Sequence, residues 1–154
     1  RKLESKGIAA TPANAHEHLM DIAGVRLICS FTSDIYTLLE ALKYQDDLKI
    51  LEVKDYIEKP KANGYQSLHL LVEIPVFLAT GSTAMRVEIQ IRTIAMDFWA
   101  SLEHKLYYKY DNEVPANISE ELRECALIIN DLDSRMLNIK FQIDHYDKEF
   151  EELT

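Results

Sequence analysis

The C-terminal part of the chain limits the possible folds most, because no glycine or proline interrupts it after Pro115. From Ile118 to Phe150, ten apolar residues follow one another at alternating spacings of four and three. This heptad pattern predicts a long helix with one apolar stripe. Unbroken, the helix would extend roughly 50 Å at 1.5 Å per residue. One small domain covers only part of such a stripe, so we expect the helix to fold back near Asn130 and Asp131 or to pack on another subunit.

Before this segment, four stretches alternate apolar and polar residues at the period of a β-strand. They are residues 24–31, 48–56, 66–74 and 86–92. In the last stretch Val87, Ile89 and Ile91 face one side, and Glu88, Gln90 and Arg92 face the other. Strands of this kind form one small sheet.

Apolar residues at helical spacing predict helices between and after the strands. One begins at Ser33 as its cap and ends near Tyr44, another runs from Thr93 to about Tyr110, and shorter ones are expected over 1–7 and 13–20. In the helix after Thr93 an apolar residue recurs every fourth position, at Ile94, Phe98, Leu102 and Leu106. We therefore predict an α+β fold with helices around a mixed four- to five-stranded sheet, divided into a domain over 1–112 and a C-terminal helical element over 113–154.

Charge and composition exclude several classes of protein. The net charge of −9 argues against a protein that coats duplex nucleic acid, and residues 113–154 carry 11 acidic against 4 basic side chains. Cys29 and Cys125 lie within apolar patterns, which favours small buried side chains over a disulfide. No stretch approaches the length of a membrane span and Arg1 begins no signal peptide, so we expect a cytoplasmic protein without membrane contact.

Two carboxylates in the predicted sheet are candidates for a metal site. Asp21 immediately precedes the first strand, and Glu88 lies on the polar face of the fourth. Carboxylates on neighbouring strands can hold Mg²⁺ against phosphates, because this ion prefers hard oxygen ligands and retains several waters. Taken alone, the two residues favour a simpler interpretation: Asp21 as a cap or turn residue, and Glu88 as a solvated residue paired with Arg86 or Arg92.

The segment from Lys59 to His69 joins a lysine-bearing loop to an aromatic residue. Tyr65, Ser67 and His69 alternate with apolar residues and so share one strand face. A tyrosine beside Lys59 and Lys61 can stack on a nucleobase while the lysines contact phosphates. The spacing alone is also typical of a tyrosine packed on the sheet and an exposed histidine.

Four motifs occur in one order and are specific when taken together. They are Asp21-Ile22-Ala23-Gly24-Val25-Arg26, Lys54-Asp55-Tyr56-Ile57, the segment from Pro60 to His69, and Glu88-Ile89-Gln90-Ile91-Arg92-Thr93. This series resembles the synthetase domain of the RelA/SpoT family. The segment from Ala95 to Lys105 is similar to the small, single-domain alarmone synthetases of that family. The resemblance extends over residues 21–110 and, in general character, over the helical tail.

The resemblance implies a nucleotidyltransferase-like fold and an enzyme of the stringent response. Such an enzyme transfers the β,γ-pyrophosphate of ATP to the 3′-hydroxyl of GDP or GTP and produces the alarmone ppGpp or pppGpp together with AMP. By this similarity Asp21 would bind Mg²⁺, and Glu88 would assist the metal and act as base for the 3′-hydroxyl. Tyr65 would stack on guanine and Arg26 on adenine.

Basic residues complete the site that the resemblance implies. Lys54, Lys61 and His69 would contact acceptor or transferred phosphates. Lys2 and Lys6 match, loosely, the end of an upstream basic segment that belongs to the family's donor site. The long family members also carry hydrolase and regulatory domains, for which this chain has no room, so we expect no alarmone hydrolysis.

Two other classes of function stay open at this point. One is a catalytically reduced regulator of the same fold that binds nucleotides or RNA, against which the intact Asp21 and Glu88 argue. The other is a metal-dependent nucleotidyltransferase or nuclease with unrelated substrates, against which the Gly64-Tyr65 loop argues.

The resemblance also implies partners. The small synthetases form homotetramers, whose central cleft can hold an alarmone as effector, and they are known to bind single-stranded RNA. We therefore expect a homotetramer held largely by the C-terminal helices, an alarmone effector in its cleft, and single-stranded RNA as a further partner.

Overall fold

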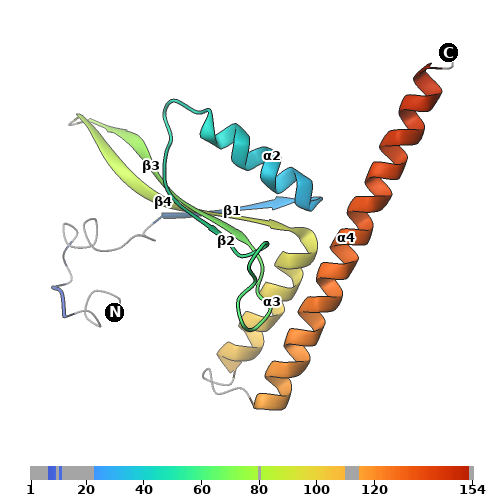
Figure 1. Cartoon of the computed structure of the whole chain (residues 1–154). Coiled ribbons are helices and arrows are strands. Elements are labelled where there is room, and N and C mark those ends of the chain that lie inside the picture. The colour runs from blue at the N-terminus through green and yellow to red at the C-terminus, as the bar shows by residue number, and fades with distance from the viewer. Residues whose placement is uncertain (1–6, 10, 12–22, 80, 110–114, 153–154) are drawn as a thin grey trace.

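The computed structural model describes residues 7–9, 11, 23–79, 81–109 and 115–152 (Figure 1). The helices expected over 1–7 and 13–20 lie outside these residues, except for Gly7 at the end of the first. In the described part, β1 (Ala23–Cys29), β4 (Gly81–Thr93), β3 (Leu68–Leu78) and β2 (Lys49–Asp55) form one sheet in the order β1-β4-β3-β2. β1 runs parallel to β4, and the other pairs are antiparallel. The predicted α+β class with a mixed sheet is confirmed.

The hairpin of β3 and β4 is longer than the sequence predicts. Its pairing continues through Ile74–Met85, Pro75–Ala84 and beyond, to Leu78–Gly81. The alternating pattern disappears there because residues 74–79 are apolar without interruption, so the period of two gave no signal. Figure 1 shows this part of the hairpin extending away from the helices.

The apolar face of the sheet packs against α2 (Thr32–Lys43). Ile35 and Leu39 of this helix are buried together with Leu68, Leu70 and Ile91 of the central strands. This cluster is the main core, and it leaves the opposite face of the sheet for polar side chains.

The predicted cap of α2 is wrong by two residues. Phe31 is the N-cap, and Ser33 lies in the first turn. The Phe31 backbone N–H donates to the Asp34 carboxylate at 3.1 Å, so the third residue of the helix satisfies the backbone of the N-cap, as in one half of a capping box.

The polar side of the sheet is bordered by α3 (Ile94–Lys109) and α4 (Ala116–Glu152). The Met96 backbone N–H donates to the Thr93 hydroxyl at 3.1 Å, so Thr93 caps α3, which begins one residue after the predicted start. Trp99 donates its indole N–H to the Leu122 carbonyl of α4 at 2.9 Å. The buried face of α3 is the one with Met96, Trp99 and Ala100. The fourfold-spaced apolar residues are exposed: Ile94, Phe98, Leu102 and Leu106.

The helix α4 is unbroken over 37 residues, so a fold-back near Asn130 and Asp131 is excluded. Its first turns pack on α3 through Leu122, Ala126 and Ile129. From there on the apolar residues of the predicted stripe are exposed: Leu132, Met136, Ile139, Ile143 and Tyr146. Figure 1 shows that this end of α4 extends past α3.

The two cysteines are free thiols. Cys29 is half-buried, but Cys125 is exposed on α4, so the prediction that both are buried is wrong for Cys125. Among the described helices, none is sufficiently long and apolar to span a membrane.

Candidate active site

One row of residues crosses the polar face of the sheet and includes all four strands. Arg26 of β1 pairs with Gln90 of β4, Gln90 with His69 of β3, and His69 with Lys54 of β2. Since side chains of paired residues lie on the same face, these four groups are neighbours. Glu88 precedes Gln90 by two positions and lies on that face too.

His69 connects the two residues expected to do most of the chemistry. Its Nε2 lies 2.8 Å from the Tyr65 hydroxyl, and its Nδ1 lies 3.0 Å from Glu88 Oε1. The His69 side chain is only 13% exposed, and this burial lowers its pKa below the ordinary histidine value, although the Glu88 carboxylate opposes the shift. The ring is therefore neutral at physiological pH, and its contact with Glu88 is a hydrogen bond. An exposed histidine at this position is excluded.

Tyr65 lies between the sheet and the lysine-bearing loop. Its ring meets the Tyr56 ring edge-on with centroids 6.2 Å apart, and Lys61 Nζ lies 4.7 Å from the centroids of both rings. A cation held over two aromatic rings can approach a phosphate, while an aromatic face that borders a cavity can receive a base. The position fits both of the sequence interpretations, since Tyr65 is packed and also lines a cavity.

Two cavities flank Arg26. The larger, of about 360 Å³, is lined by Tyr65, Arg92 and Arg26 and by residues 100, 101 and 103–105 of α3. The smaller, of about 240 Å³, is lined by residues 24–26, Glu88 and Gln90. Arg26 is half-exposed, and its guanidinium reaches the Asp97 carboxylate at 3.3 Å. A flat cation between two cavities suits the expected stacking on a base.

The other predicted site residues divide into two groups. Lys54 is exposed beside Glu52, whose carboxylate lies 3.0 Å away and raises the pKa of the lysine. Lys2, Lys6 and Asp21 lie outside the described residues, and their roles stay predictions.

Gln90 and Arg92 are site residues that the sequence reasoning did not single out. Both belong to a motif that carried the resemblance, yet they received no role of their own. Arg92 is 5% exposed, and it donates to the Tyr65 hydroxyl at 2.6 Å and to Gln90 Oε1 at 2.9 Å. The alternation of β4 places both side chains on the polar face, but it does not reveal that Arg92 is covered there.

A cation site is only partly present in the described part of the chain, where no group of three His, Cys, Asp or Glu residues could hold a metal ion. Glu88 is the carboxylate that lines the smaller cavity. Its side chain is 31% exposed, and among the described residues each oxygen accepts one side-chain hydrogen bond, from His69 and from Gln90. A carboxylate oxygen has a further lone pair, so Glu88 can accept a proton or bind a cation.

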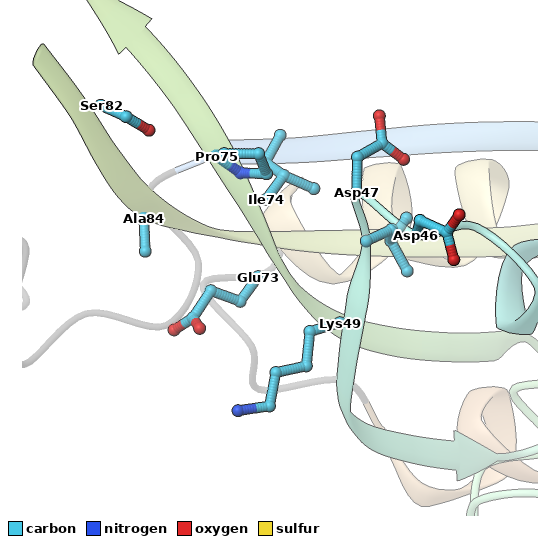
Figure 2. Close-up of a pocket in the computed structure, with 9 residues that line it drawn as sticks. Asp46, Asp47, Lys49, Glu73, Ile74, Pro75, Ser82 and Ala84 are labelled. Atoms are coloured by element: carbon cyan, nitrogen blue, oxygen red, sulfur yellow. The ribbon is translucent and has the colours of Figure 1, made fainter.

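A third cavity, of about 290 Å³, lies at the other end of the sheet beside the β3–β4 hairpin (Figure 2). Its lining includes the carboxylates of Asp46, Asp47 and Glu73 but only one lysine, Lys49. A mainly acidic lining repels phosphates, so this cavity does not fit a nucleotide. The cationic groups for a polyphosphate are on the polar face of the sheet.

The comparisons with known proteins agree with this arrangement. The family described as the region found in RelA / SpoT proteins matches residues 1–113. The chain is 56% identical over 143 residues to the GTP pyrophosphokinase YwaC of Bacillus subtilis strain 168. This alignment covers 93% of this chain and 68% of that protein.

Solved structures show the same fold. The small alarmone synthetase 2 from Bacillus subtilis has a TM-score of 0.84 at 55% identity, over 92% of this chain and 73% of that one. The small alarmone synthetase 1 from the same organism, bound to its product pppGpp, has a TM-score of 0.83 at 37% identity, over 92% and 72% of the two chains. Its complex with AMPCPP has a TM-score of 0.74 at 33% identity, over 93% and 70%.

A match that spans most of the sequence, together with a relative that shares more than half of the aligned residues, shows that the chain belongs to the RelA/SpoT family.

Proposed function

We propose that this chain is a GTP pyrophosphokinase of the stringent response. It transfers the β,γ-pyrophosphate of ATP to the 3′-hydroxyl of GDP or GTP and produces ppGpp or pppGpp together with AMP. The observation that carries the proposal is the connection of Glu88 through His69 to Tyr65, on a polar sheet face bordered by two cavities. Related structures that hold pppGpp and AMPCPP support the acceptor and the donor.

Glu88 is the proposed general base. A secondary hydroxyl is a poor nucleophile at neutral pH, so transfer requires a carboxylate within reach of its proton. The Glu88 carboxylate is held from two sides, by His69 at 3.0 Å and by Gln90 at 3.3 Å, and it lines the smaller cavity. The two hydrogen bonds restrain the rotamer of Glu88, and the carboxylate stays accessible at the edge of the smaller cavity.

Cationic and aromatic groups would position the nucleotides. Phosphoryl-type transfer depends on positioning and charge neutralisation more than on covalent chemistry. We propose that Tyr65 receives guanine, that Arg26 receives adenine, and that Lys54 and Lys61 contact phosphates. His69 is already bonded at both ring nitrogens, so it can contact a phosphate only by giving up one of these bonds.

Mg²⁺ is the proposed cofactor. Glu88 fits this ion because it offers hard oxygen atoms with free lone pairs at the edge of a cavity. Asp21 is the proposed second ligand. When bound, Mg²⁺ would neutralise negative charge on the transferred pyrophosphate.

We propose that residues 113–154 form an oligomerisation element and that the protein is a homotetramer. The exposed apolar residues of α4 beyond Ile129 support association of this helix, and acidic neighbours such as Asp131 and Asp144 would confine the contact to the stripe. An alarmone effector in the cleft between subunits, single-stranded RNA as a further partner and a cytoplasmic location belong to the same proposal.

The test is to incubate the protein with ATP, Mg²⁺ and either GDP or GTP, and to resolve the nucleotides by chromatography. Formation of ppGpp or pppGpp with stoichiometric AMP supports the proposal. The Glu88→Gln variant should fold normally and lose at least roughly a hundredfold in turnover, the low end for loss of a general base. Guanine nucleotide binding without product in the wild type would indicate the catalytically reduced regulator instead.

A further inference from the structure

We propose that Arg92 is a positioning residue, which holds the Tyr65 hydroxyl and the Gln90 amide so that a closed ring of five side chains fixes the Glu88 carboxylate. The inference rests on the proposed function, because it concerns Glu88 as the base. It gives Arg92, which also lines the larger cavity, a role through the residues that it holds.

The ring is continuous in the structure. Arg92 Nη2 donates to the Tyr65 hydroxyl at 2.6 Å, and this hydroxyl lies 2.8 Å from His69 Nε2. His69 Nδ1 lies 3.0 Å from Glu88 Oε1. Gln90 Nε2 donates to Glu88 Oε2 at 3.3 Å, and Gln90 Oε1 accepts from Arg92 Nη2 at 2.9 Å. The same arginine nitrogen therefore begins and ends the ring.

The direction of each hydrogen bond follows from the chemistry of the groups. Arginine only donates, so the Tyr65 oxygen and Gln90 Oε1 are acceptors. The Tyr65 proton is then available to His69 Nε2, which leaves the histidine proton on Nδ1, where it donates to Glu88. With Gln90 donating to the other oxygen, every donor in the ring meets an acceptor, provided that Glu88 is ionised.

Only an arginine can occupy the closing position. The Arg92 guanidinium also donates from Nε to the Ser67 hydroxyl at 3.4 Å and from Nη1 to the Asp97 carboxylate at 3.2 Å. Its planar fork thus serves partners in several directions at once, and Asp97 balances its buried charge. A lysine has one nitrogen and cannot span these positions.

The ring has a consequence for catalysis. His69 and Gln90 each form a hydrogen bond with a different oxygen of Glu88, and together these bonds fix the plane of the carboxylate. It also connects that carboxylate to the ring of Tyr65, so the guanine platform and the base keep one relative geometry. A displacement of about 1 Å at a reacting group can reduce a rate roughly a hundredfold. Loss of the ring should therefore lower kcat measurably even if Glu88 moves only slightly.

The first test is Tyr65→Phe, because it keeps the aromatic face and removes only the hydroxyl. We expect kcat for alarmone synthesis to fall about 10- to 100-fold, whereas KM for GDP should change by less than about twofold because stacking is retained. A Tyr65→Phe variant with wild-type kcat would overturn the proposal.

The second test is Arg92→Lys, which keeps the charge and removes the fork. The same loss of kcat with an unchanged KM for GDP is expected. Arg86→Lys is the matched control, because Arg86 lies on the same strand and outside the ring; it should retain wild-type kcat. Thermal unfolding of the three variants separates a positioning effect from loss of fold, and Tyr65→Phe decides the question if Arg92→Lys is unstable.

A third measurement does not depend on activity. Nitrogen NMR of the imidazole in the wild type should show His69 as the neutral form with its proton on Nδ1, and Tyr65→Phe should remove this preference. A proton on Nε2 in the wild type would overturn the ring. If the expected tautomer is found but no alarmone is made, the proposed function fails while the ring stands; if alarmone is made and Tyr65→Phe is fully active, the positioning role fails alone.

Discussion

Replacing Gly64 by alanine should test how closely the loop before Tyr65 packs on α4. Gly64 has a φ of +89°, a conformation that costs L-residues roughly 1–2 kcal/mol. A Cβ at this position would also lie 2.5 Å from the Ala126 Cβ and 3.7 Å from backbone atoms of Arg123. Such overpacking costs about 1–3 kcal/mol. The total of about 2–5 kcal/mol is a large part of the 5–15 kcal/mol that stabilises an ordinary domain.

The same substitution should also weaken binding of the guanine nucleotide. The backbone N–H of Gly64 donates to the Lys61 carbonyl at 2.8 Å, and the next residue is Tyr65. A loop that must move away from Ala126 carries Lys61 and Tyr65 with it, and both are proposed to contact GDP. We expect calorimetric titration to show a higher Kd for GDP even in the fraction of protein that remains folded.

Two further variants separate the causes. Gly81→Ala is the control for backbone strain alone, because Gly81 has a φ of +130° and its added Cβ would meet nothing within 4 Å. Adding Ala126→Gly to Gly64→Ala removes the methyl group that the new Cβ would meet. The double variant should therefore regain the free energy lost to the clash but not that lost to the positive φ, after allowance for about 1 kcal/mol of lost helix propensity. Denaturant unfolding measures all four free energies. If Gly64→Ala costs no more than Gly81→Ala, the close packing of the loop on α4 is refuted.

Three other outcomes are expected. Tyr65→Ala should raise the Kd for GDP by the equivalent of about 1–3 kcal/mol and affect ATP less, as measured by calorimetry; equal effects on both nucleotides would contradict the stacking role. Burial raises the pKa of Asp133 above the ordinary 3.8, so this group stabilises the fold below that pH and the contribution is lost as pH rises through the folded-state pKa. Asp133→Asn keeps an acceptor for the Thr93 hydroxyl and does not titrate, so it should not lose stability as the pH rises. The difference in unfolding free energy between this variant and the wild type should therefore be larger, in favour of the variant, at neutral pH than in acid. A difference that does not change with pH would contradict the raised pKa of Asp133. Met136→Glu combined with Ile143→Glu should shift the mass in light scattering from tetramer toward dimer or monomer, and a wild type that is already monomeric at micromolar concentration would contradict the tetramer.

The strands and the two faces of the sheet could be predicted from the sequence because a period of two is a local property. Leu68, Leu70 and Ile91 face the core, and Glu88 and Gln90 face the other way, as the alternation predicts. The heptad pattern likewise predicted a long helical segment, but only the structure excludes the fold-back near Asn130 and Asp131. Identification of Tyr65, His69 and Glu88 as one site needed the motifs, and their direct connection needed the structure.

The burial of Arg92 and the choice of the packed face of α3 could not be predicted, because both depend on contacts between distant parts of the chain. The alternation of β4 treats Arg92 like any polar residue, yet α3 and the loop before Tyr65 cover it. Apolar residues occur all around α3, so its sequence does not identify the face that packs. The Trp99 hydrogen bond to the Leu122 carbonyl decides that choice, and it joins residues 23 positions apart.

The helix α4 contacts both the loop before Tyr65 and the end of β4. At successive turns of α4, Leu122 receives the hydrogen bond from α3, Ala126 packs on Gly64, and Asn130 accepts from Gln66 at 3.4 Å. One turn further, Asp133 accepts from the Thr93 hydroxyl where β4 passes into α3. The proximal half of α4 therefore supports the loop that bears Tyr65 and the strand end that bears Arg92, and the distal half presents the exposed apolar stripe. Since a helix is stiff, subunits that associate through the distal half would also restrain the proximal half, and the geometry of the active site would depend on assembly.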